Sequence, residues 1–139
     1  MVRWVFLRPE GRIVDVLVAA RDIRVRRALS GLVELAGSRI VGATHAACLV
    51  PDLDVQLAPD LVVLEMDRRD VPHGLQIVER LTRRGRCLIV VCSGPTQCTA
   101  VLAAGARTCL DRDDPTFADR LAEAVQAVTG PSDRRLQQE

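Results

Sequence analysis

The sequence contains no lysine and very few aromatic residues. All nineteen basic residues are arginine, and the aromatic residues number one Trp, two Phe and no Tyr. The absence of lysine excludes any mechanism that needs a side-chain amine. The scarcity of aromatic residues disfavours a stacking platform for single-stranded nucleic acid. A net charge of +1 adds no bias toward nucleic acid or an acidic substrate.

Several other signals are also missing. No apolar run approaches the ~20 residues that span a bilayer, and no signal-peptide pattern is present, so we expect a soluble, cytoplasmic protein without a membrane role. No glycine-rich loop follows the first predicted strand and no Gly-x-Ser-x-Gly occurs, which disfavours dinucleotide binding and hydrolase activity. His45 and His73 have no partners at zinc-ligand spacing, and we therefore expect no metal and no cofactor.

The five cysteines lack a paired metal or redox spacing. An odd number in mostly apolar surroundings indicates reduced thiols packed in the core of a cytosolic protein. Cys92 and Cys109 fall near the ends of two predicted strands, so a response to oxidation is a less favoured alternative. The cysteines are Cys48, Cys87, Cys92, Cys98 and Cys109.

Short β-branched runs alternate with amphipathic ones along most of the chain. Strands are predicted at 12–20, 39–44, 60–65, 87–92 and 106–110, and helical segments at 21–37, 45–58, 74–85, 94–105 and 114–130. Asp22 and Asp114 are candidate N-caps, while Pro51 interrupts the second helical segment. This alternation predicts a three-layer, doubly wound α/β domain with a five-stranded parallel sheet. We expect a domain at 13–130, an N-terminal extension at 1–12 and a polar tail or linker at 131–139.

Functional residues of such a sheet gather at the C-terminal ends of its strands. The third strand ends in a carboxylate, Glu65, after the apolar run LVVL. The corresponding positions on the first and fourth strands are Ala20–Arg21 and Cys92–Ser93. The central question for function is therefore whether Glu65 is a working acid.

Three stretches resemble the response-regulator receiver domain over roughly residues 13–130. VLVAARDIRVRRAL resembles its first strand and helix, and APDLVVLEMD resembles the segment that ends at its phosphate-accepting aspartate. LAAGARTCLDRDDP is similar to the fourth helix and fifth strand of receivers in NarL/LuxR-type transcription regulators. The resemblance implies a flavodoxin-like, CheY-like (βα)5 fold.

The same resemblance implies which residues occupy the positions that carry receiver chemistry. The two magnesium-binding acids fall on Ala20 and Arg21, and the phosphate acceptor falls on Glu65. The hydroxyl position falls on Cys92, with Ser93 as a one-step alternative. The lysine position falls on Arg112, and the aromatic switch position falls on Cys109.

These substitutions predict a degenerate pocket. Mg²⁺ requires oxygen ligands, which alanine does not supply, and Arg21 brings a positive charge to the place of the ion. Without a metal, the charge of an incoming phosphoryl group is not neutralised. We therefore expect Glu65 to be a non-catalytic carboxylate held by Arg21, Arg112 or both, acting as a structural plug. A mimic of the phosphorylated state and a solvated glutamate are the alternatives.

The sequence thus favours an atypical receiver that is not an enzyme and acts as a phosphorylation-independent interaction or dimerisation module. The alternative is a receiver, still phosphorylated at Glu65 or Asp67 or responsive to a small ligand, that controls a DNA-binding output domain. No direct nucleic-acid binding by this domain is expected. The arginine runs at 24–27, 68–69 and 83–86 are interpreted as solvated charges.

A homodimer is expected through the fourth helix, fifth strand and fifth helix, or through the first and fifth helices. The small apolar residues proposed for this surface are Ala100, Val101, Ala104, Leu121, Ala124, Val125 and Val128.

Overall fold

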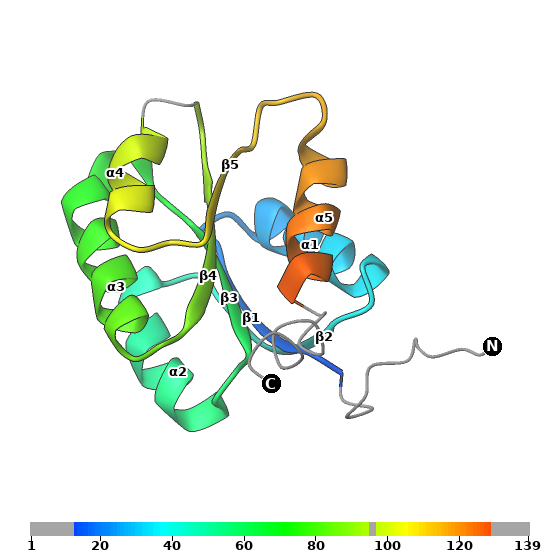
Figure 1. The fold of residues 1–139 in the computed structure, drawn as a ribbon, viewed down its shortest axis with the longest axis horizontal. Coiled ribbons are helices and arrows are strands. Elements are labelled where there is room, and N and C mark those ends of the chain that lie inside the picture. The colour runs from blue at the N-terminus through cyan, green and yellow to red at the C-terminus, as the bar shows by residue number, and fades with distance from the viewer. Residues whose placement is uncertain (1–12, 95–96, 129–139) are drawn as a thin grey trace, which may run out of the picture.

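A computed structural model describes residues 13–94 and 97–128 as five strands and their covering helices (Figure 1). The strands form one parallel sheet in the order β2-β1-β3-β4-β5. The elements are β1 (Asp15–Ala19), α1 (Ile23–Leu35), β2 (Arg39–Thr44), η1 (Ala47–Leu49), α2 (Val50–Leu57), β3 (Leu61–Glu65), η2 (Arg68–Asp70), α3 (Val71–Arg83), β4 (Cys87–Cys92), α4 (Cys98–Ala103), β5 (Thr108–Asp111) and α5 (Phe117–Val128). This is the predicted three-layer, doubly wound α/β fold.

Helices cover both faces of the sheet. Helices α1 and α5 lie on one face, and α2, α3 and α4 lie on the other (Figure 1). Alternate residues of the central strands point to opposite faces, as the strand period requires. Val63 packs on the α1–α5 side and Val62 on the other, and both are fully buried. Burial on both faces explains why the central strands are continuous apolar runs.

Most of the predicted local signals operate in the structure. The Asp22 carboxylate accepts a hydrogen bond from the backbone N–H of Arg24 at 2.7 Å and caps α1. Pro51 stands in the first turn of α2, where a missing N–H costs little. Asp114 accepts from the Thr116 N–H at 2.8 Å, but α5 begins only at Phe117, later than predicted.

Helices α3 and α4 differ from their predicted limits. Helix α3 begins at Val71, three residues before the predicted start, because Pro72 in its first turn continues the helix rather than a loop. Helix α4 has only six residues and begins at Cys98. The predicted N-terminal extension, the polar tail, Pro95 and Gly130 lie outside the described residues. Within the described ranges, no helix has the length and apolarity needed to cross a membrane.

A buried ion-pair cluster corrects the interpretation of the arginine run at 83–86. The Asp54 side chain is only 1% exposed and accepts from Arg84 Nη1 at 3.0 Å and from Arg86 Nε at 2.5 Å. The same arginines also donate to the carbonyls of Pro51 and Pro59. Two of these arginines, Arg84 and Arg86, therefore join α2 to the α3–β4 connection through buried contacts.

The apolar residues proposed for a dimer surface lie partly in the core. Ala100 is exposed, and Ala104 and Ala124 are half-buried. The larger side chains face the sheet because they form the apolar stripes of α4 and α5. Those buried in the core are Val101, Leu121, Val125 and Val128.

Candidate functional site

An open cleft of about 1080 Å³ lies where the C-terminal ends of β1 and β3 meet the connections that follow them. Its lining includes Ala20 and Arg21 after β1, Glu65 at the end of β3, and Arg112 after β5. Parallel strands place these segments at one edge of the sheet although they are far apart in the sequence. Four of the five residues expected at the pocket therefore line one cleft.

Glu65 and Arg112 form an ion pair in this cleft. Arg112 Nη1 donates to Glu65 Oε2, and the Glu65 side chain is 13% exposed while that of Arg112 is 40% exposed. The backbone places both groups, because Glu65 is the last residue of β3 and the Arg112 N–H bonds the Cys92 carbonyl at 2.7 Å beside the end of β5. Of the two arginines expected to hold Glu65, Arg112 provides the side-chain partner.

The cleft shifts the protonation equilibrium of Glu65. Burial raises the pKa of Glu65 above its ordinary value of 4.5, because removal of water penalises the charged form. The charge of Arg112 and the backbone N–H of Arg21 act in the opposite direction and lower the pKa without cancelling the effect of burial. The carboxylate thus depends on its partners to remain charged.

Arg21 does not pair with Glu65 through its side chain. Its Nη1 lies 2.9 Å from Asp67 Oδ2, and Asp67 also accepts from the backbone N–H of Arg69 at 2.9 Å. These hydrogen bonds lower the pKa of Asp67, with the N–H of Arg69 as the largest cause. Asp67 therefore remains ionised and offsets the charge of Arg21.

The structure corrects the assignment of Cys92 to the pocket. Strand alternation turns its side chain to the α4 side of the sheet, where it is fully buried and lies 3.0 Å from the sulfur of Cys109. Cys109, at the expected switch position, packs against that same apolar layer. Ser93, the alternative, lines the cleft, and its hydroxyl donates to Asp113 at 3.2 Å.

His45 and His73 both reach the cleft, which sequence reasoning did not anticipate. His45 follows β2 and His73 stands in the first turn of α3, so both lie next to strand ends. The positions of the two histidines relative to the predicted strands could have identified them. The spacing between the two histidines gives no such signal.

The arrangement does not offer a group of oxygen ligands for a metal. Ala20 supplies no side-chain oxygen, and the Asp22 carboxylate caps α1. In the described ranges, no three His, Cys, Asp or Glu side chains converge on this cleft closely enough to bind an ion. Four acidic residues line the cleft, and three of them, Asp22, Glu65 and Asp67, are each paired with an arginine.

The comparisons with solved structures decide the fold class. The signal receiver domain of the response regulator NarL from Mycobacterium tuberculosis superposes with a TM-score of 0.70 at 18% identity, covering 86% of this chain and 98% of that one. A LuxR-family DNA-binding response regulator from Staphylococcus aureus gives a TM-score of 0.70 at 16% identity, covering 84% and 98%.

The chain has the receiver-domain fold.

A third receiver-fold neighbour comes from a different functional setting. CpaE, a protein named for pilus assembly in Burkholderia thailandensis, gives a TM-score of 0.67 at 25% identity, covering 84% of this chain and 98% of that one. No protein-family model matches the sequence. No curated protein matches it. The receiver fold therefore rests on structural likeness.

Proposed function

We propose that this chain is an atypical receiver that acts without phosphorylation as a protein-interaction or dimerisation module. The observation that carries the proposal is the ion pair between Glu65 and Arg112. It occupies the positions at which the resemblance places the phosphate acceptor and the phosphate-binding lysine of an active receiver. The site thus has its own carboxylate and its own guanidinium.

The pair opposes phosphoryl transfer in two ways. The Glu65 carboxylate is mostly buried and accepts from Arg112, so an attack on phosphorus requires that this contact break first. The longer side chain also displaces the nucleophilic oxygen relative to aspartate, and reaction rates are sensitive to such displacements. The engaged carboxylate supports a structural role for Glu65 rather than a nucleophilic one.

The Arg21–Asp67 pair supports the same proposal at the metal position. Mg²⁺ would have to approach a guanidinium that already neutralises Asp67 at 2.9 Å. Phosphoryl transfer relies on a metal to compensate developing negative charge, and a fixed guanidinium hinders metal binding. The cleft is therefore proposed to work without a metal ion.

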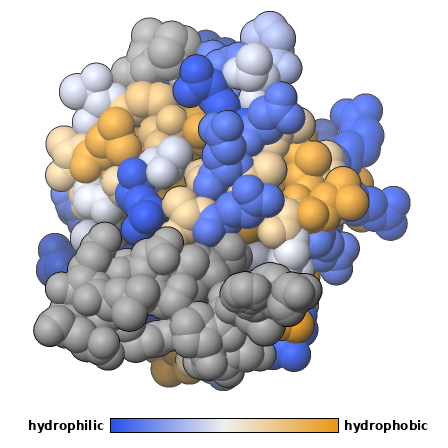
Figure 2. Space-filling model, turned by 45° about the vertical axis from the view of Figure 1, so that its right-hand side comes forward, coloured by the Kyte–Doolittle hydropathy of each residue, from blue (hydrophilic) through white to orange (hydrophobic). Residues whose placement is uncertain are grey.

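We propose protein binding rather than catalysis as the output, in the cytoplasm. Leu102 on α4 is 48% exposed and Ile23 on α1 is 48% exposed, one for each of the two dimer surfaces considered. Figure 2, which turns the α5 side of the molecule forward, displays two hydrophobic areas with hydrophilic residues between them. Leu102→Glu is expected to weaken self-association in sedimentation if the α4–β5–α5 surface is used, and Ile23→Glu if α1 and α5 are used. An unchanged monomer–dimer equilibrium in both variants would reject these surfaces.

Amide NMR spectra test the proposal. The full chain is recorded with Mg²⁺ alone, with Mg²⁺ and beryllofluoride, and with Mg²⁺ and acetyl phosphate. We expect no localised change at Glu65 or Asp67, whereas a phosphorylatable receiver run in parallel changes around its acceptor. Localised, saturable shifts with beryllofluoride would refute phosphorylation independence.

The size of the cleft favours one second candidate, a sensor of a small ligand. Its volume of about 1080 Å³ is comparable to that of small-molecule sites, and Arg21, His45 and His73 lie along its wall. Inorganic phosphate without Mg²⁺ is the simplest probe. Saturable shifts at these three residues would favour the sensor over the interaction module.

A further inference from the structure

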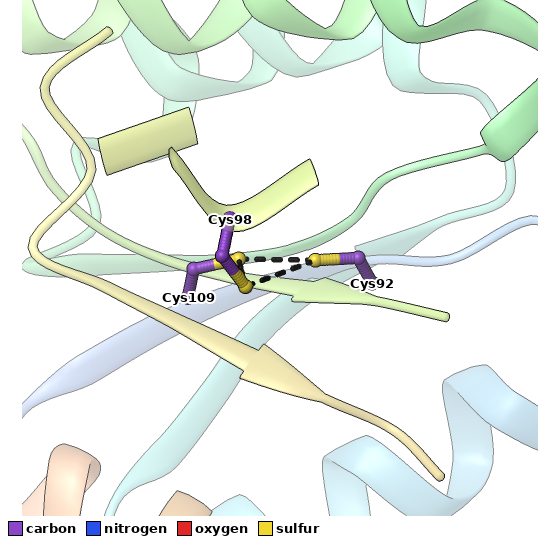
Figure 3. Close-up of side chains that lie close together, drawn as sticks. All are labelled: Cys92, Cys98 and Cys109. Carbon is purple, nitrogen blue, oxygen red and sulfur yellow. Dashed lines mark hydrogen bonds between the residues drawn. The ribbon is translucent and has the colours of Figure 1, made fainter. Parts of the chain in front are cut away.

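Three cysteine side chains from separate elements meet on the α4 side of the sheet (Figure 3). Cys92 ends β4, Cys98 begins α4, and Cys109 lies in β5. Their sulfur atoms are separated by 2.7 Å for Cys98–Cys109, 3.0 Å for Cys92–Cys109 and 3.8 Å for Cys92–Cys98. The group lies outside the cleft lining and is not used by the proposed function.

The strand register brings the sulfur atoms together. Val90 pairs with Cys109, so Cys92 lies two residues further along the neighbouring strand and on the same face. The first turn of α4 then places Cys98 over the same face. Cys92 is fully buried, while Cys98 and Cys109 are half-buried, which leaves the group accessible from one side.

The group has the composition of a metal site. Within residues 13–94 and 97–128, these cysteines form the one set of three His, Cys, Asp or Glu side chains whose ligand atoms all lie within 4.8 Å of one another. Two of the sulfur separations are shorter than the ~3.5 Å of ordinary van der Waals contact between carbon atoms. Sulfurs held this closely are well placed either to share a cation or, when an oxidant accepts two electrons and two protons are released, to form a disulfide.

We propose that Cys92, Cys98 and Cys109 together bind one soft, thiophilic cation, of which Cu(I) is the best match. A circle through sulfurs with these separations has a radius of about 1.9 Å, so an ion about 1.3 Å out of their plane has three metal–sulfur bonds of about 2.3 Å. A trigonal ion with the same bonds needs sulfur separations of about 4 Å, so the Cys98 and Cys109 side chains must spread apart when the ion binds.

Among the residues that the structure describes, no fourth His, Cys, Asp or Glu joins the three sulfurs, and this selects the class of ion. Structural zinc sites take four protein ligands, whereas soft thiolate sets favour Cu(I). The nearest acid along β5, Asp111, is committed elsewhere, because its Oδ1 accepts from the backbone N–H groups of Gly94 and Asp113 at 2.9 Å each. A three-sulfur site therefore suits a cation that accepts low coordination.

The protonation of the thiols is compatible with this assignment. Hydrogen bonding from Cys109 lowers the pKa of Cys92 to about 7, and the same interaction raises the pKa of Cys109. The entering cation displaces the protons of the thiols it binds. Because binding releases protons, the affinity for the metal rises with pH.

Metal binding is tested on the full chain after reduction with a phosphine and removal of oxygen. Cu(I), buffered by a competing chelator, is titrated and the complex is weighed by native mass spectrometry. We expect one ion per chain and a rise in the melting temperature of about 5–10 °C at saturating metal. Cys92→Ser, Cys98→Ser and Cys109→Ser each abolish stoichiometric binding, whereas Cys48→Ser, at an exposed cysteine outside the group, retains it.

A second measurement keeps the test decisive if a serine variant does not fold. In the wild-type chain, Cu(I) should protect Cys98 and Cys109 from alkylation while Cys48 continues to react. Failure of the reduced chain to bind Cu(I), or equal binding by all three serine variants, overturns the proposal.

Discussion

Removing the Arg112 guanidinium should destabilise the folded chain by about 1–2 kcal/mol. Exposed ion pairs contribute about 0.2–1 kcal/mol, whereas breaking a fully buried pair costs about 3–5 kcal/mol. The Glu65–Arg112 pair lies between these cases, since the Glu65 side chain is 13% exposed and that of Arg112 is 40% exposed. Solvent on the arginine side screens the interaction, so the expected cost is closer to that of an exposed pair than to that of a buried pair.

A double-mutant cycle isolates the interaction from the separate effects of each side chain. Arg112→Gln leaves a mostly buried carboxylate without its cation, and Glu65→Gln removes the charge but keeps an acceptor. We expect the double variant to be less destabilised than the sum of the single variants, with a coupling of about 1 kcal/mol. Urea unfolding followed by far-UV circular dichroism at pH 7 measures each corner of the cycle.

The Arg21–Asp67 pair is the matched control. Its side chains are 66% and 29% exposed, so its coupling should not exceed about 0.5 kcal/mol. A coupling below about 0.3 kcal/mol for Glu65–Arg112, or one no larger than that of the control pair, would refute the view that the cleft contains a structural ion pair.

Three further outcomes follow from the same structure. Asp54→Ala should cost about 3–5 kcal/mol in urea unfolding because it leaves two arginines without their buried carboxylate, whereas Asp52→Ala on the exposed side of α2 should cost under ~1 kcal/mol. Gly105→Ala should lower the free energy of unfolding by about 2 kcal/mol or more, because φ is +115° and a Cβ would collide with a threonine of α3. Gly31→Ala is the control: this glycine has open space around it in α1, so the substitution should raise the free energy of unfolding by up to ~1 kcal/mol. The stability that Glu65 contributes relative to Glu65→Gln is present below pH 4.5 and is lost as pH rises through the raised pKa of Glu65. The difference in unfolding free energy between wild type and variant should therefore fall as the pH rises above 4.5, and a difference that grows with pH contradicts the assigned direction.

The sheet was predictable because its information is local. The β-branched runs of β1, β3 and β4 mark buried strands, and Asp22 and Pro51 mark helix starts by backbone chemistry that neighbouring residues cannot override. The C-terminal ends of parallel strands lie at the same edge of a sheet. This rule predicted that Glu65, Arg21 and Arg112 lie close together.

Side-chain partners were less predictable because they depend on distant segments. Arg86 reaches Asp54 across 32 positions, and nothing near either residue distinguishes this arginine from a solvated one. The same applies to Cys98, which joins the thiol group only because α4 is short and begins directly over β5. Strand alternation would have separated Cys92 from the cleft, since it directs that side chain to the opposite layer from Val91.

The Asp54 cluster also constrains how the domain can move. It lies at the N-terminal ends of β3 and β4, whereas the cleft lies at their C-terminal ends. Because these contacts tie α2 to the segments just before β3 and β4, they oppose separation of α2 from the sheet at the end opposite the cleft.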